Sequence, residues 1–330
     1  MIDLSTSYMG MNLKNPIVAS SSPFWEDIKN IKKAEKSGAA AIVLHSLFQE
    51  QTEIEQEELN RFLVEGSESY AEAITYYPEI KEFKFLPDQY VDLVKEAKQN
   101  STIPIIGSIN GVSDGGWIKY AQKIENAGAD ALELNIYYIP TDFSKNCVEI
   151  EQNYSNLIKA VKQKVKIPIA VKLSPYFTST PNILKTFEKA GADAFVIFNR
   201  FYQPDIDIEN LEVTPNLILS SSEELRLRIR WAAILYGKIR PDIAITGGIH
   251  TSTDVIKSMM AGAKVSMMTS SLIKNGISHI EKVLSETTNW LLNHEYDSIK
   301  SIQGLMSQRN VSSPSAYERA NYMKLLGSYR

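Results

Sequence analysis

AGADA occurs twice in this chain, at residues 127–131 and 190–194, and close variants stand at 37–41 (SGAAA) and 261–265 (AGAKV). Each copy follows a stretch of helical periodicity and precedes a short apolar run. The shared glycine suits the position just after a helix, where a positive φ costs it little. The four copies therefore predict four joints at which a helix ends and a buried strand begins.

A second phrase marks the starts of further strands. IPIIGSI (103–109), IPIAVKL (167–173) and RPDIAITGGI (240–249) place a proline ahead of an apolar run, where its missing N–H costs no strand hydrogen bond. The runs are short and almost continuously hydrophobic, as is typical of parallel strands covered on both faces. The predicted strands are Ile17–Ala19, Ala41–Leu44, Ile105–Ile109, Ala131–Ile136, Ile169–Leu173, Phe195–Phe198, Ile243–Thr246 and Val265–Met268. Helical stretches between them include Ile28–Lys36, Tyr90–Ala97, Ile183–Lys189 and Asp254–Met260.

Strands that alternate with helices predict a parallel sheet, and this number of strands predicts closure into a (β/α)8 barrel of the TIM type. The alternative is an open doubly wound sheet, which usually has a G-x-G-x-x-G turn after its first strand. Here that turn reads SSSPFW (20–25). We expect one barrel domain over residues 1–306, a lid segment inserted after the second strand at about 47–86, and a C-terminal extension at 307–330.

The composition narrows the class of protein. A chain of 330 residues with a net charge of −4 and no basic face indicates a small-molecule substrate rather than a nucleic acid. The N-terminal segment lacks the pattern of a secretory signal, and no apolar run is long enough to cross a membrane, so we expect a cytoplasmic protein. The single cysteine, Cys147, and four scattered histidines predict no metal site. Redox chemistry would then need an organic cofactor.

A phosphate site is predicted near the end of the barrel sequence. TGGIHTSTD (246–254) supplies two glycines and the start of a helix, and MMTSSL (267–272) follows the last strand. Backbone N–H groups at such glycines can approach a phosphate closely, and the fold usually binds phosphate after its last two strands. The alternative is that Gly247 and Gly248 form only a tight turn and that Ser252 caps a helix.

Lys172 ends a buried strand, and a lysine is rarely buried without a partner. Two roles stay open for it: the Schiff-base lysine of an aldolase, or a cation beside a flavin. Asn135 and Asn199 also follow apolar strands and offer paired donors and acceptors suited to an amide-rich ring. Alternatively, they satisfy loop backbone.

These stretches resemble the dihydroorotate dehydrogenase family from Asp3 to about Gly304. The resemblance rests on KNPIVASSSPF (14–24), SGAAAIV (37–43), SINGVS (108–113), ELN (133–135), IAVKLSPYF (169–177), FNR (198–200) and ITGGIHTSTDVIKSMMAGAKVSMMTSSLI (245–273). It implies a (β/α)8 barrel that holds FMN and oxidises dihydroorotate to orotate in pyrimidine biosynthesis.

The resemblance also implies roles for individual residues. Lys172 would lie at the N1/O2 side of the flavin, where a cation stabilises the reduced anion. The other contacts with the flavin ring would come from Ser20, Ser21, Ser22, Asn110 and Asn135. The flavin phosphate would be held by Gly247, Gly248, Thr269 and Ser270, with a further contact from Ser221. The substrate would be bound by Asn135 and Asn199.

Three substrate-side motifs depart from the family. The N-L-S-C-P-N loop reads NIYYIP here, so the position of the catalytic base falls on Tyr138; T-K-S becomes Leu44, His45 and Ser46; and AITYYPE (73–79) lacks the asparagine of N-S-M-G-L-P-N. Because a tyrosine donates a proton more readily than it removes one at neutral pH, Tyr138 or Tyr137 suits a reductase, with His45 assisting. The alternative is that both tyrosines only pack in a lid.

Three functions stay open at this point. The first is an FMN oxidoreductase acting on CH–CH bonds, with dihydroorotate or another unsaturated or amide-containing substrate. Its electrons would pass to a soluble acceptor or a partner subunit, and a homodimer is compatible with the sequence. The second is a Schiff-base aldolase that uses Lys172, and the third is a flavin-binding protein without catalysis of its own.

Overall fold

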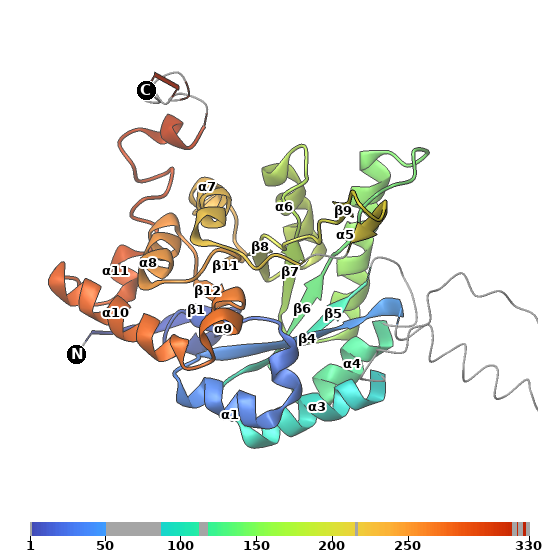
Figure 1. The fold of residues 1–330 in the computed structure, drawn as a ribbon, viewed down its shortest axis with the longest axis horizontal. Helices are drawn as coiled ribbons and strands as arrows, with labels where there is room; N and C mark the ends of the chain where they lie inside the picture. The colour runs from blue at the N-terminus through green and yellow to red at the C-terminus, as the bar shows by residue number, and fades with distance from the viewer. Residues whose placement is uncertain are drawn as a thin grey trace, which may run out of the picture.

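The computed structural model describes residues 2–50, 87–111, 118–214, 217–318, 322 and 326–327. Eight parallel strands close into a barrel (Figure 1), which confirms the predicted TIM fold. In spatial order they are β11 (Asp242–Thr246), β12 (Val265–Met268), β3 (Ile17–Ala19), β4 (Ala41–Phe48), β5 (Ile105–Asn110), β6 (Ala131–Asn135), β7 (Ile169–Leu173) and β8 (Ala194–Ile197). Each begins within one residue of its predicted start.

Helices surround the barrel and cover the outer face of its sheet (Figure 1). They are α1 (Ile28–Lys36), α3 (Pro87–Asn100), α4 (Ile118–Asn126), α5 (Cys147–Lys164), α6 (Thr180–Ala190), α7 (Leu225–Leu235), α8 (Ser252–Ala261), α9 (Ser270–Asn275), α10 (His279–Asn293) and α11 (Ile299–Ile302). Short 3-10 turns are η1 (Pro23–Glu26), η2 (Ser222–Glu224) and η3 (Pro314–Tyr317). All four predicted joints have a glycine with φ between +100° and +112°, at Gly38, Gly128, Gly191 and Gly262.

The barrel interior is apolar at its lower end and polar at its mouth. A hairpin of β1 (Thr6–Tyr8) and β2 (Met11–Leu13) packs Tyr8 and Leu13 against inward-facing residues such as Ile106, Ala131 and Ala170. Because side chains on one face recur every second residue, the next inward positions on β5, β6 and β7 are Ser108, Glu133 and Lys172. The polar residues therefore gather at the carboxyl ends of the strands.

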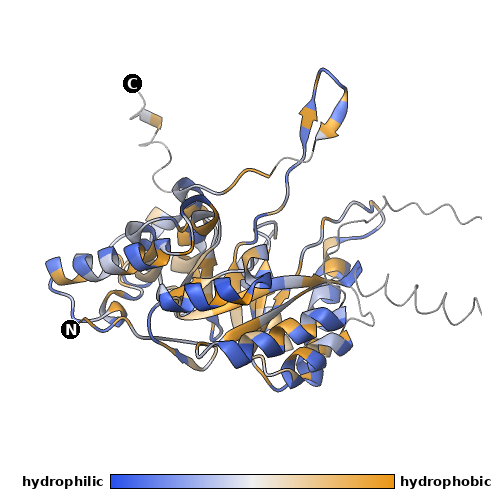
Figure 2. Cartoon of the chain, turned by 60° about the horizontal axis from the view of Figure 1, so that its bottom comes forward, coloured by the Kyte–Doolittle hydropathy of each residue, from blue (hydrophilic) through white to orange (hydrophobic). Residues whose placement is uncertain are grey.

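Two segments extend the barrel. The antiparallel strands β9 (Asp205–Asp207) and β10 (Glu212–Thr214) form a hairpin, here called the arm, that projects away from the barrel (Figure 2). Near the C-terminus, Ser307 is buried and the N–H of Gln308 donates to the carbonyl of Ala233 on α7, so the chain still contacts the helix layer at these residues. Residues 51–86 of the predicted lid lie outside the described residues. Among the described residues, no helix has the length and hydrophobicity needed to span a bilayer.

Candidate functional site

The floor of the barrel mouth holds a buried ion pair. The Nζ of Lys172 on β7 lies 3.1 Å from Oε1 of Glu133 on the neighbouring strand β6, and the two side chains are only 8% and 1% exposed. Register places Asn135 opposite Lys172, so Glu133 stands one inward position below that pair. Glu133 was not among the predicted site residues, although it lies within the ELN motif and is a charged residue in an otherwise apolar run.

A layer of amides and hydroxyls surrounds this pair. Asn110, Asn135 and Lys172 are in register across β5, β6 and β7, so their inward side chains lie side by side. The Nδ2 of Asn199, just after β8, donates to Oδ1 of Asn135 at 2.7 Å. The structure thus brings the two predicted substrate asparagines together beside the lysine, which the sequence alone did not show.

The three predicted serines after β3 have different surroundings. Ser20 is buried two residues after the inward-facing Val18, and its hydroxyl lies 4.0 Å from the sulfur of Met267 in the barrel interior. The side chain of Ser22 instead accepts the N–H of Phe24 and caps η1. The carbonyl of Ser21 accepts from the hydroxyl of Thr269 at 3.5 Å, which ties the ends of β3 and β12 together.

The predicted phosphate end lies where β11 and β12 finish. Gly247 and Gly248 have φ of +82° and +85°, a conformation that glycine adopts without strain. The hydroxyl of Ser220 accepts the N–H of Gly248 at 3.4 Å, and the N–H of Ser220 donates to the hydroxyl of Ser270 at 3.2 Å. The Nζ of Lys274 donates to the carbonyl of Ser220 at 3.0 Å and brings a positive charge to the same place.

Ser220, rather than the predicted Ser221, makes these contacts, and Ser221 is exposed. The sequence LSSS offers three equivalent hydroxyls, and only the path of the loop decides which one faces the glycines. Lys274 was also missed, because it lies on α9, five residues after Thr269, and carries no local signal.

A buried arginine supports the glycine turn from below. Arg228 on α7 donates from Nε to the carbonyl of Thr246 at 2.9 Å and from NH1 to the carbonyl of Glu224 at 2.7 Å. A Cβ on Gly247 would lie 2.8 Å from NH2 of this arginine, so the turn packs tightly on the guanidinium. Burial lowers the pKa of Arg228. Its position on the buried face of α7 was a usable signal, since Leu225 and Ala232 precede and follow it by one helical turn.

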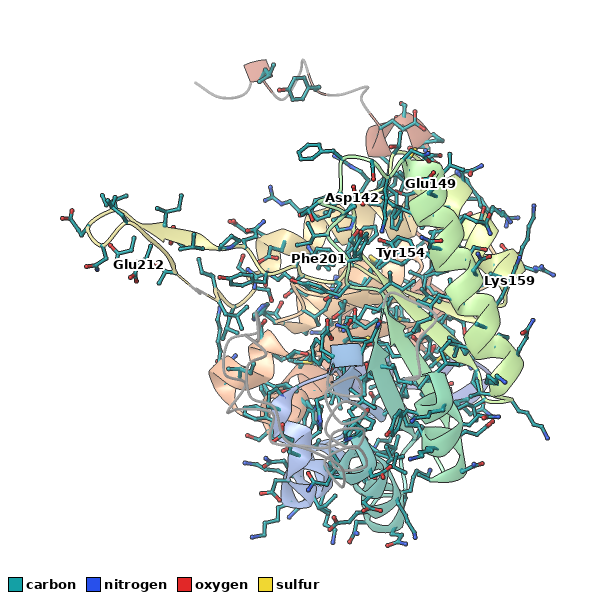
Figure 3. The ribbon with its side chains drawn as sticks, turned by 90° about the vertical axis from the view of Figure 1, so that its right-hand side faces the viewer. Asp142, Glu149, Tyr154, Lys159, Phe201 and Glu212 are labelled. Atoms are coloured by element: carbon teal, nitrogen blue, oxygen red, sulfur yellow. The ribbon has the colours of Figure 1, made fainter. Side chains whose placement is uncertain are left out.

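The two predicted catalytic tyrosines point into different surroundings. The ring of Tyr137 stacks on Phe201 with centroids 4.1 Å apart, and its hydroxyl accepts the N–H of Tyr202 at 2.7 Å. The ring of Tyr138 instead packs edge-on against Tyr154 of α5, at 6.4 Å, beside the core of the helix layer. Figure 3 labels Phe201 and Tyr154, the two residues that these rings contact.

His45 lies against the helix layer as well. Its ring packs edge-on against Tyr90 of α3 at 5.0 Å, and burial lowers the pKa of His45 to about 4. A register irregularity in β4 between Val43 and Ser46 turns Ser46 inward, where its hydroxyl lies 2.8 Å from that of Ser108. His45 is therefore neutral near pH 7 and does not replace the charge of the lysine that stands at this place in the family motif.

The donor set suits FMN. Anionic phosphate matches the end formed by Gly248, Ser270 and Lys274, and the cation of Lys172 with the amides of Asn110 and Asn135 matches the polar edge of a flavin. Both sets lie at the carboxyl ends of barrel strands, where the active sites of this fold are found.

Comparison with known proteins gives one consistent answer. The family model described as dihydroorotate dehydrogenase matches residues 86–291. The catalytic subunit of dihydroorotate dehydrogenase B (NAD(+)) from Thermoplasma acidophilum is 27% identical over 320 residues, which cover 92% of this chain and 99% of the relative. A putative dihydroorotate dehydrogenase A (fumarate) from Aeropyrum pernix is 25% identical over 92% of this chain and 97% of its own. The chain therefore belongs to the dihydroorotate dehydrogenase family.

Proposed function

We propose that this protein is an FMN-dependent oxidoreductase that acts on a CH–CH bond of a small planar substrate. The observation that carries the proposal is the barrel mouth itself, where the Lys172 cation and the Asn135–Asn199 amide pair stand beside a separate cluster suited to phosphate. Bound FMN would supply the hydride acceptor or donor. The protein would supply binding, orientation and the proton.

Each end of the site has its own task. Gly247, Gly248, Ser220, Ser270 and Lys274 would hold the phosphate, and Arg228 keeps the glycine turn in place. Lys172 would hold the electron-rich edge of the ring through charge. Asn135 and Asn199, already hydrogen bonded to each other, leave further amide groups to orient an amide-containing substrate.

The ion pair argues against the aldolase alternative. A Schiff-base lysine must present a free electron pair to a carbonyl, whereas the Lys172 nitrogen donates to a buried carboxylate at 3.1 Å. This geometry suits a fixed cation better than a nucleophile.

The contacts favour Tyr137 over Tyr138 as the proton-transfer residue. The Tyr137 hydroxyl accepts one hydrogen bond from Tyr202, in the segment that also carries Asn199. Within the part of the chain that the structure describes, its own proton has no acceptor, so it can be donated to a substrate. Tyr138 belongs by its contacts to the packing of α5. We therefore assign the proton-transfer role to Tyr137 and a packing role to Tyr138. Tyr138 is the residue that stands at the position of the catalytic base in the family motif.

Conversion of dihydroorotate to orotate is the first substrate assignment, because the relatives carry that name. The second is reduction of another unsaturated substrate. It is supported by the tyrosines in the NIYYIP loop and by the neutral His45, since both alter the substrate side. Electrons would leave to a soluble acceptor or to a partner subunit, as the name "catalytic subunit" of the Thermoplasma relative suggests.

The test is to release and identify the cofactor of the purified protein and then to mix the protein anaerobically with dihydroorotate. FMN that bleaches with dihydroorotate supports the first assignment, and FMN that stays oxidised supports the second. Protein that neither carries nor takes up FMN, and that is trapped on Lys172 by borohydride with a carbonyl substrate, would overturn the proposal in favour of the aldolase.

A further inference from the structure

Among the described residues, Glu133 is the most deeply buried charged group. Its side chain is 1% exposed, and Oε1 accepts from Lys172. Within the described part of the chain, Oε2 has no hydrogen-bond partner. An isolated carboxylate in such a place is costly, so its presence calls for a charge that compensates it. Lys172 is the cation that the structure places within reach.

The barrel leaves room for this pair by using small residues around it. Glu133 stands opposite Ala170, and Ala170 stands opposite Ala194. The carboxylate therefore lies directly beneath the level of Lys172 and Asn135, and the ammonium is held from below. Among the described residues, Glu133 is the acceptor of the Lys172 ammonium, so its remaining N–H donors are available above.

We propose that Glu133 is a positioning residue that fixes the Lys172 ammonium at the barrel mouth and balances its charge, so that a ring bound above meets a nearly neutral pair rather than a bare cation. This inference rests on the proposed flavin site. A bare ammonium would stabilise the reduced, anionic ring strongly and retain its electrons. The paired ammonium moderates that effect and lets electrons pass on to an acceptor.

The test compares Glu133→Gln with the unchanged protein in the FMN-loaded state. Glutamine keeps an acceptor for Lys172 but removes the negative charge. We expect the reduction potential of bound FMN to rise and sulfite, an anion that adds to the oxidised flavin ring, to bind about tenfold more tightly. Ser266→Ala is the matched control, because this buried hydroxyl lies on the outer face of β12 and should leave both quantities unchanged.

A Lys172→Met background distinguishes charge balance of Lys172 from a general effect of the Glu133→Gln substitution on the site. In Lys172→Met there is no ammonium for Glu133 to hold or to balance, so a role that acts through Lys172 is already lost. Adding Glu133→Gln to Lys172→Met should therefore change sulfite affinity less than about twofold. An equal effect of Glu133→Gln in both backgrounds would overturn the proposal.

A flavin-independent measurement completes the test. To attack formaldehyde, the Lys172 nitrogen must leave the carboxylate that holds it and give up a proton. Reductive methylation at Lys172, followed by mass spectrometry, should therefore be about tenfold faster in Glu133→Gln. Unchanged methylation would overturn the positioning role. Failure to take up FMN would instead overturn the proposed function, while the methylation result still decides what Glu133 does to Lys172.

Discussion

At the scale of single residues, the two adjacent tyrosines allow a direct comparison. Tyr137→Phe removes the hydroxyl that we assign to proton transfer, and we expect kcat to fall about a hundredfold while FMN stays bound. Tyr138→Phe is the matched control, and its kcat should change less than about threefold, because its ring packs on Tyr154. Steady-state kinetics on the substrate that reacts with the flavin would measure both. If Tyr138→Phe lowers kcat more than Tyr137→Phe does, Tyr138 is the proton-transfer residue instead.

His45 makes the stability of the protein depend on pH. Burial lowers its pKa from 6.5 to about 4, so the folded state disfavours a proton that the unfolded state binds. Stability contributed by the neutral imidazole is therefore present above about pH 6.5 and is lost as the pH falls toward about 4.

His45→Gln removes this titration and keeps a side chain that can form hydrogen bonds. Between about pH 7.5 and about pH 4.5, we expect the unchanged protein to lose about 2 kcal/mol more unfolding free energy than the variant, as measured by urea denaturation. If both proteins lose the same unfolding free energy over this pH range, His45 stays uncharged or is solvated when it is protonated.

At the scale of elements, the joint between α8 and β12 packs tightly against the ring of Tyr236. Gly262 has φ of +112°, and a Cβ there would lie 2.3 Å from the ring of Tyr236, which also packs against Gly304. Gly128, at the equivalent joint after α4, has φ of +100°, and a Cβ there would make only ordinary contact, 3.7 Å from Cγ of Lys98. Replacing Gly128 therefore tests the backbone strain without the overpacking.

We expect Gly262→Ala to destabilise the fold by about 3 kcal/mol and Gly128→Ala by about 1 kcal/mol, because only the first adds overpacking to left-handed strain. Thermal melting would show the larger fall in Tm for Gly262→Ala. Equal falls would mean that Tyr236 moves aside without cost.

At the scale of the whole molecule, the arm is a two-stranded sheet separate from the closed barrel. Its large apolar side chains Ile206, Ile208, Leu211 and Val213 are each at least 70% exposed. Ile206 and Val213 are paired in register, and Asp207 and Glu212 form the next pair, so one face of the ribbon is apolar and the other acidic. Figure 3 shows the arm, marked by Glu212, extending away from the barrel. An isolated two-stranded hairpin is marginally stable in water, so we expect protein to cover this apolar face.

We expect a second copy of the chain to cover it in the purified protein. Replacing Ile206 and Val213 together with serine should reduce the mass measured by light scattering to that of a monomer. Leu292→Ser on α10, which changes an exposed leucine far along the chain from the arm, should leave the mass unchanged. A monomeric parent protein would rule out the second copy and point to a different partner subunit.

The barrel could be predicted from the sequence alone. Proline before a strand, glycine after a helix and the short apolar run between them are local requirements, and all eight strands followed from them. Family motifs also placed Lys172, Asn135 and the glycine turn at the mouth.

Which side chains meet in the site could not be predicted and became clear only from the fold. The irregularity in β4 turns His45 toward α3, the loop path selects Ser220 over Ser221, and strand register sets Glu133 beneath Lys172. The physical reason is that backbone propensity acts within a few residues, whereas register, loop path and the partner of a buried charge depend on elements far apart in the chain.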